Sequence, residues 1–160
     1  MCTPEPTAPF EQPRALDAAG DYDGAINELA RGTKQKDPHC TRQLGLRLLT
    51  GNRAPLMPAE GLQFLGEACD GGLPEAAARA AGILALGVRV PPNWPLALAW
   101  LYRSAAGGWD LARQQLLALC DDRGLAASAA SSVNPDWRAV ASAVRLDDWR
   151  SAPPPNVESP

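Results

Sequence analysis

Few residues in this 160-residue sequence have the types and spacing that catalysis or metal binding requires. The single histidine, His39, stands beside Cys40, and paired carboxylates occur at 121–122 and 147–148. Nucleophilic triads need a histidine base that is held by an acid, and most zinc sites need several histidine or cysteine ligands at short fixed spacing. Neither pattern occurs here, and no phosphate-binding glycine loop occurs either. We therefore predict a non-enzymatic protein with no catalytic residues, no metal site and no cofactor.

A row of polar residues points to a different chemistry, the binding of another protein. Gln43, Arg79 and Gln115 stand 36 residues apart, with Arg42 and Gln114 beside them. An arginine offers a planar group with several donors, which suits an acidic or extended segment of a partner. We predict that these five residues form a partner-binding row. The alternative, a solvated helix face, remains open.

The overall charge argues against nucleic acid as the partner. Fifteen lysines and arginines stand against 18 acidic residues, which gives a net charge of −3. Nucleic-acid-binding domains carry a basic field that neutralises phosphates. We expect a protein partner, and a chain that is a monomer when unbound.

The elements that position the polar row repeat with the same period of 36 residues. Three columns of small or apolar residues share this register. These columns are Ala25, Gly61 and Ala97; Ile26, Leu62 and Leu98; and Leu29, Leu65 and Leu101. Each period contains two helical segments, because prolines such as Pro38 and Pro74 stand where helices begin and glycines such as Gly51 and Gly87 stand where they end.

We predict an all-α fold of antiparallel helix pairs that stack into a short right-handed solenoid, in one domain over residues 14–150. Proline-rich segments at 1–13 and 151–160 are expected to be a disordered tether and tail. The serine- and alanine-rich segment around Ser128 is expected to be a plain connector. The predicted helices are 14–20, 24–32, 38–50, 58–70, 74–87, 95–106, 110–122 and 135–149.

Two segments resemble the second helix of a Sel1-like repeat, namely residues 61–72 and 97–108. Leu44-Gly45 is similar to the Leu-Gly pair in the first helix of that family, and residues 20–22 are closer to the related tetratricopeptide pattern. The resemblance covers roughly residues 15–120. It implies a protein-interaction scaffold, with first helices that line the concave face and therefore carry the polar row.

The resemblance, the small size and a possible lipid anchor together suggest an adaptor that inhibits a bacterial toxin or effector, as immunity proteins do. The alternative is a structural or assembly scaffold in an envelope machine for secretion or polysaccharide export. The sequence leaves both open. Two tryptophans, Trp109 and Trp137, are candidate interface anchors, because aromatic residues are enriched in binding hot spots; the alternative is that they pack at helix starts.

The cysteines allow two expectations about the cell compartment. Cys2 is followed by a proline-rich stretch, as in a mature bacterial lipoprotein, which predicts lipidation at Cys2 and a periplasmic location; a native cytoplasmic start at Met1 is the alternative. Antiparallel helices at 38–50 and 58–70 bring Cys40 close to Cys69. In a periplasmic protein these two could form a disulfide, and two buried free thiols are the alternative.

Overall fold

The computed structural model describes residues 11–145, and within this range the chain forms nine helices and no strand. The N-terminal helices are α1 (Glu11–Ala18), α2 (Tyr22–Lys34) and α3 (Pro38–Thr50). The central helices are α4 (Pro58–Asp70), α5 (Pro74–Leu86) and α6 (Trp94–Ala106). The C-terminal helices are α7 (Asp110–Leu119), α8 (Arg123–Ser131) and α9 (Trp137–Ser142). The predicted all-α class is confirmed.

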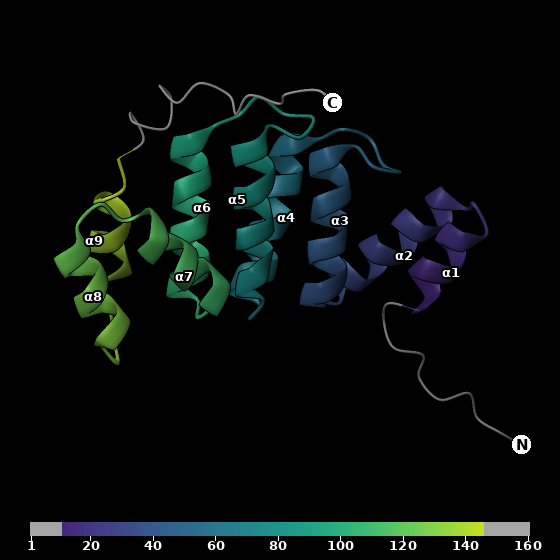
Figure 1. Cartoon of the computed structure of the whole chain (residues 1–160). Helices are drawn as coiled ribbons and strands as arrows, with labels where there is room; N and C mark the ends of the chain where they lie inside the picture. Colours follow the sequence, from purple (N-terminus) through teal and green to yellow (C-terminus); the bar gives the residue numbers. More distant parts are fainter. Residues whose placement is uncertain (1–10, 146–160) are drawn as a thin grey trace, which may run out of the picture.

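The helices pack in chain order, so that the molecule is a row of antiparallel pairs (Figure 1). The most extensive contacts join α3 to α4 and α5 to α6, and lesser contacts join α2 to α3 and α4 to α5. One such pair cannot cover its own apolar faces, and each pair is therefore completed by its neighbours. The chain is a solenoid of stacked helix pairs.

The period of 36 residues is visible in the backbone. The same N–H···O=C hydrogen bond closes three successive turns at 3.0, 3.0 and 3.1 Å: Asp37 to Gly32, Leu73 to Ala68, and Trp109 to Ser104. A second bond recurs at 2.9 Å in two successive loops: Met57 to Leu48, and Asn93 to Leu84. Corresponding residues of successive repeats therefore occupy corresponding places, as the sequence register predicted.

Glycines set the close approach of α3 and α4. A Cβ atom on Gly61 would lie 2.6 Å from the backbone nitrogen of Leu49 and 2.8 Å from the carbonyl oxygen of Gly45. Both neighbours are backbone atoms, which cannot turn aside as a flexible side chain can. Only glycine fits at this crossing.

We expect Gly61→Ala to lower the free energy of unfolding by about 1–3 kcal/mol, because the added methyl overpacks this crossing. The matched control is Gly82→Ala in α5, where a Cβ would meet no atom within 4 Å. Alanine is the better helix former, so the control should gain about 0.5–1 kcal/mol. Chemical denaturation of both variants checks this pair, and equal stability of the two would refute the close crossing.

A buried ion pair joins α1 to α3. The Arg47 guanidinium donates to the Asp17 carboxylate, and their side chains are 7% and 14% exposed. Arg53 lies 3.7 Å from the other Asp17 oxygen and stacks over the ring of Tyr22, 4.9 Å from its centroid. These contacts fasten the first helix onto the solenoid.

The helices at the two ends of the described range differ from those that the sequence predicts. Helix α1 begins at Glu11, within the segment assigned to the tether, while residues 1–10 and 146–160 lie outside the described residues. The expected connector around Ser128 is the helix α8: its Asp122 side chain accepts from the Leu125 N–H, and its alanines favour helix. The last helix, α9, runs over Trp137–Ser142 and not 135–149: Asp136 caps its start, and residues 146–149 of the predicted helix lie outside the described residues.

Candidate partner-binding face

Two arginines of the predicted row lie near each other on α3 and α5. Arg42 forms an ion pair with Glu75, which links the two helices, and both side chains are mostly buried at 19% and 22% exposure. Arg79, one turn beyond Glu75, is exposed and forms no ion pair with any other residue in the range 11–145. Burial lowers the pKa of Arg42, and the positive charge of Arg79 lowers it further.

This cluster carries more positive than negative charge. Two guanidinium groups face one carboxylate, and the buried Nε of Arg42 has no hydrogen-bond partner among the described residues. The repulsion between Arg42 and Arg79 would be relieved by a second carboxylate placed beside Arg79. The α5 surface at Arg79 is therefore suited to an acidic group.

The glutamines of the row are distributed along the same series of helices. Gln43 is half-buried on α3, and Gln114 and Gln115 are both exposed on α7. Gln115 lines a hollow between α5 and α7, whereas Gln114 does not. The structure thus brings Arg42 and Arg79 together and places Gln115 across the hollow from α5.

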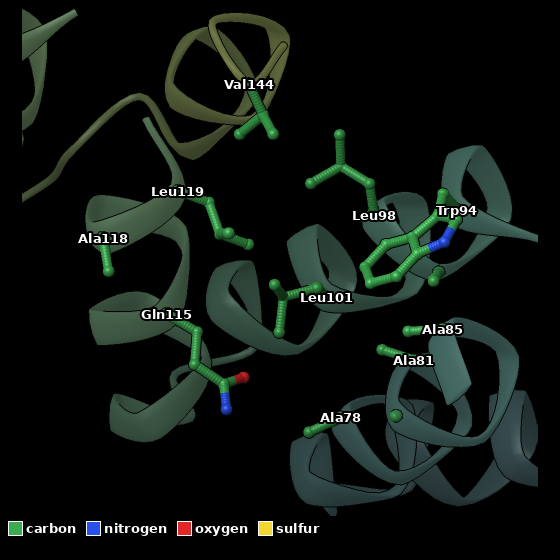
Figure 2. A pocket seen from close by; sticks show the side chains of 12 residues that line it. Ala78, Ala81, Ala85, Trp94, Leu98, Leu101, Gln115, Ala118, Leu119 and Val144 are labelled. Atoms are coloured by element: carbon green, nitrogen blue, oxygen red, sulfur yellow. The ribbon is translucent and has the colours of Figure 1, made fainter. Parts of the chain in front are cut away.

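That hollow, which we call the groove, has a volume of about 410 Å³ and is open to solvent on one side. Figure 2 shows α5 alanines on one wall, Gln115 and Leu119 of α7 on the other, Leu101 between them and Val144 at one end. Almost all of the lining is apolar. Its residues are Ala78, Ala81, Gly82, Ala85, Trp94, Ala97, Leu98, Leu101, Gln115, Ala118, Leu119 and Val144.

The groove exists because α5 presents small side chains to this face. Ala78, Gly82 and Ala85 follow one another at helical spacing, and a Cβ on Gly82 would meet no atom within 4 Å. Helix α7 packs mainly on α6, α8 and α9, so it does not close the space in front of α5. The sequence analysis missed the groove, although this stripe of small residues beside Arg79 was its visible signal.

The two tryptophans expected as interface anchors belong to the core. Trp137 is 8% exposed, and the Arg113 guanidinium stacks on its ring at 5.5 Å from the centroid. Trp109 is half-buried and packs on the same C-terminal core cluster. Both tryptophans therefore pack at helix starts, as the alternative interpretation predicts. The exposed tryptophan of this region is Trp94, which is 37% exposed and lines the groove.

No disulfide joins Cys40 to Cys69 in the structure, where Cys40 is buried and Cys69 is partly buried. The Cys40 sulfur packs against Gly32 of α2, and burial together with Asp37 raises its pKa to about 11. Cys69 lies beside Arg103 of α6, and burial raises its pKa against the opposing effect of that arginine. The two thiols face different neighbouring helices. Cys2, the expected lipidation site, lies outside the described residues.

Metal binding and a membrane span find no support in residues 11–145. That part of the chain holds no group of three or more histidine, cysteine or acidic side chains that could bind a metal ion. It also has no helix long and apolar enough to cross a membrane. The acidic pair at 121–122 is structural: Asp122 caps α8, and Asp121 lies 3.7 Å from Arg145.

A solved structure from Oxalobacter formigenes, a Sel1 repeat protein, is similar to this chain. The two share 26% sequence identity with a TM-score of 0.50, over 74% of this chain and 88% of the other. No protein-family model matches the sequence, and no curated protein matches it significantly.

Proposed function

From the Sel1-like repeat fold of this chain, we propose that it is a protein-binding adaptor that captures an extended segment of a partner along α5 and α7. Sel1-like repeats in general mediate protein–protein interaction as non-catalytic scaffolds. The observation that carries the proposal is the apolar groove, with Gln115 in its wall and exposed Arg79 directly after the lining residue Ala78 on α5.

The groove defines the chemistry of the captured segment. A large apolar side chain fits between the alanines of α5 and the leucines of α6 and α7. An acidic residue close to it in the segment pairs with Arg79, which satisfies the excess positive charge there. Gln115 can donate to and accept from the backbone of an extended peptide.

Within this class, we propose a toxin or effector as the partner, with the chain acting as its inhibitor. The alternative is an assembly scaffold of an envelope machine. The groove, which can hold one extended segment of a partner, supports the first proposal. The identity of the recovered partner separates the two: a secreted effector supports inhibition, and a component of an export complex supports the scaffold.

We propose that the protein, as its native host makes it, is lipidated at Cys2 and tethered to a membrane in the periplasm. The support is the composition of the stretch that follows Cys2. Detergent-phase partitioning of the protein from its native host is expected to recover it in the detergent phase, whereas a Cys2→Ser variant stays in the aqueous phase. A wild-type protein that partitions with the aqueous phase and lacks an acyl mass would contradict the tether.

Arg79→Glu is expected to weaken partner binding by about 2 kcal/mol, roughly thirtyfold in Kd, because a multi-donor contact is lost and a like charge takes its place. The melting temperature should hardly change, because Arg79 is exposed and the new carboxylate lies near Arg42. Calorimetry with the partner recovered by pull-down measures the effect. The matched control is Arg14→Glu, which makes the same charge change on an exposed residue of α1. If both variants bind as tightly as the parent, the row is only a solvated face.

A further inference from the structure

We propose that residues 146–149 of this chain, Leu-Asp-Asp-Trp, dock in the groove when no partner is bound. The segment would then act as an internal competitor. This inference rests on the proposed function of the groove and adds its regulation. It also names the ligand chemistry, an aromatic side chain beside adjacent carboxylates.

The chain reaches the groove at a fixed point. Val144 lines one end of the groove, and the segment around it is held to the end of α7 by two contacts. The Asp121 N–H donates to the Ala143 carbonyl at 3.3 Å, and Arg145 lies 3.7 Å from the Asp121 carboxylate. The residues that follow Arg145 therefore start beside the groove.

The length of chain suits the size of the hollow. Trp149 stands five residues beyond Val144, and five extended residues span at most about 17 Å. A groove of about 410 Å³ with an almost wholly apolar lining accommodates an indole ring. An indole buried between Trp94 and the leucines of α6 and α7 would remove a large apolar area from water.

The charges are also complementary. Asp147 and Asp148 directly precede Trp149, and exposed Arg79, which follows the groove residue Ala78 on α5, has no ion pair with any residue that the structure describes. Trp94, which lines the groove, is 37% exposed. A segment that carries both an indole and carboxylates matches both features.

Tethering gives this competitor an advantage over a free peptide of the same sequence. A short link makes the effective concentration of a tethered segment about millimolar, so weak docking is enough to fill the groove. A partner then binds only when the segment leaves. If the segment is docked for about nine-tenths of the time, the apparent Kd of the partner is raised about tenfold.

The test places a photo-crosslinking aromatic residue, p-benzoylphenylalanine, at position 149 of the full chain. Peptide mapping after irradiation is expected to find intramolecular cross-links to groove residues such as Ala85, Trp94 and Leu98. A second substitution in the same chain, Gly82→Leu, fills the groove and should abolish these cross-links. Cross-links to other surfaces, or a cross-linked dimer that shows a second copy in the groove, would overturn the proposal.

A second measurement separates this proposal from the proposed function. Trp149→Ala should tighten partner binding about tenfold, and Arg79→Glu added to Trp149→Ala should then weaken it, because the internal competitor that also uses Arg79 is already lost. An unchanged Kd for Trp149→Ala with a weakened Arg79→Glu would reject the internal competitor and keep the adaptor. An unchanged Kd when Arg79→Glu is added to Trp149→Ala, with groove cross-links from position 149, would keep the docked segment and reject the adaptor face.

Discussion

An Asp17→Ala variant is expected to lose about 3–5 kcal/mol of unfolding free energy, because it leaves the Arg47 guanidinium buried without its partner charge. Arg47 is 6% exposed, and its Nη1 already lacks a hydrogen-bond partner among the described residues. For a chain of this length the loss corresponds to a fall in melting temperature of about 10 °C. Thermal unfolding followed by circular dichroism measures it.

The matched control for this variant is Asp23→Ala, which removes an exposed carboxylate from the neighbouring helix α2. It should change stability by less than about 0.5 kcal/mol. The double variant Asp17→Ala/Arg47→Met should recover much of the loss, because no charge then remains buried. If Asp17→Ala and Asp23→Ala unfold at the same temperature, the ion pair does not fasten α1 to the solenoid.

Gly82→Leu is expected to weaken partner binding at least about a hundredfold, roughly 3 kcal/mol, while the fold stays intact. The new side chain extends from α5 into open space within the groove, because a Cβ at this position meets no atom within 4 Å. Replacing a helix-interior glycine also favours the folded state. Loss of binding therefore cannot be ascribed to unfolding.

The control for the groove-filling variant Gly82→Leu is Gly82→Ala. It adds only one methyl group and should bind the partner within a few fold of the parental Kd. Both variants are titrated with the partner by calorimetry, and their melting temperatures are measured alongside. A Gly82→Leu chain that is folded and binds at the parental Kd would show that the partner does not enter the groove.

Much of the fold was predictable from the register of 36 residues. The bounds of α3 and α4 agree with the prediction because Pro38 and Pro58 stand at helix starts, while Gly51 and Gly71 follow their last residues. The sequence does not predict helix α8, because its serines favour a loop; in the structure its alanines and the Asp122 cap outweigh them.

The site was predictable only in part. Arg79 and Gln115 were found because they repeat at one position of successive first helices. The groove depends on the small size of the residues at Ala78, Gly82 and Ala85 and on the position of the short helix α7. Burial of Trp137 is a tertiary property as well, since Arg113 and the C-terminal core cover a residue that begins a helix.

Methyl NMR of the full chain, titrated with its partner, tests most directly whether the partner occupies the face formed by α5 and α7. Shift changes are expected at groove methyls such as Ala85, Leu98 and Leu119. The methyls of Ala59 and Leu62, which line a separate shallow hollow between α4 and α6, should keep their positions. Shifts confined to Ala59 and Leu62, with unmoved groove methyls, would contradict the claim.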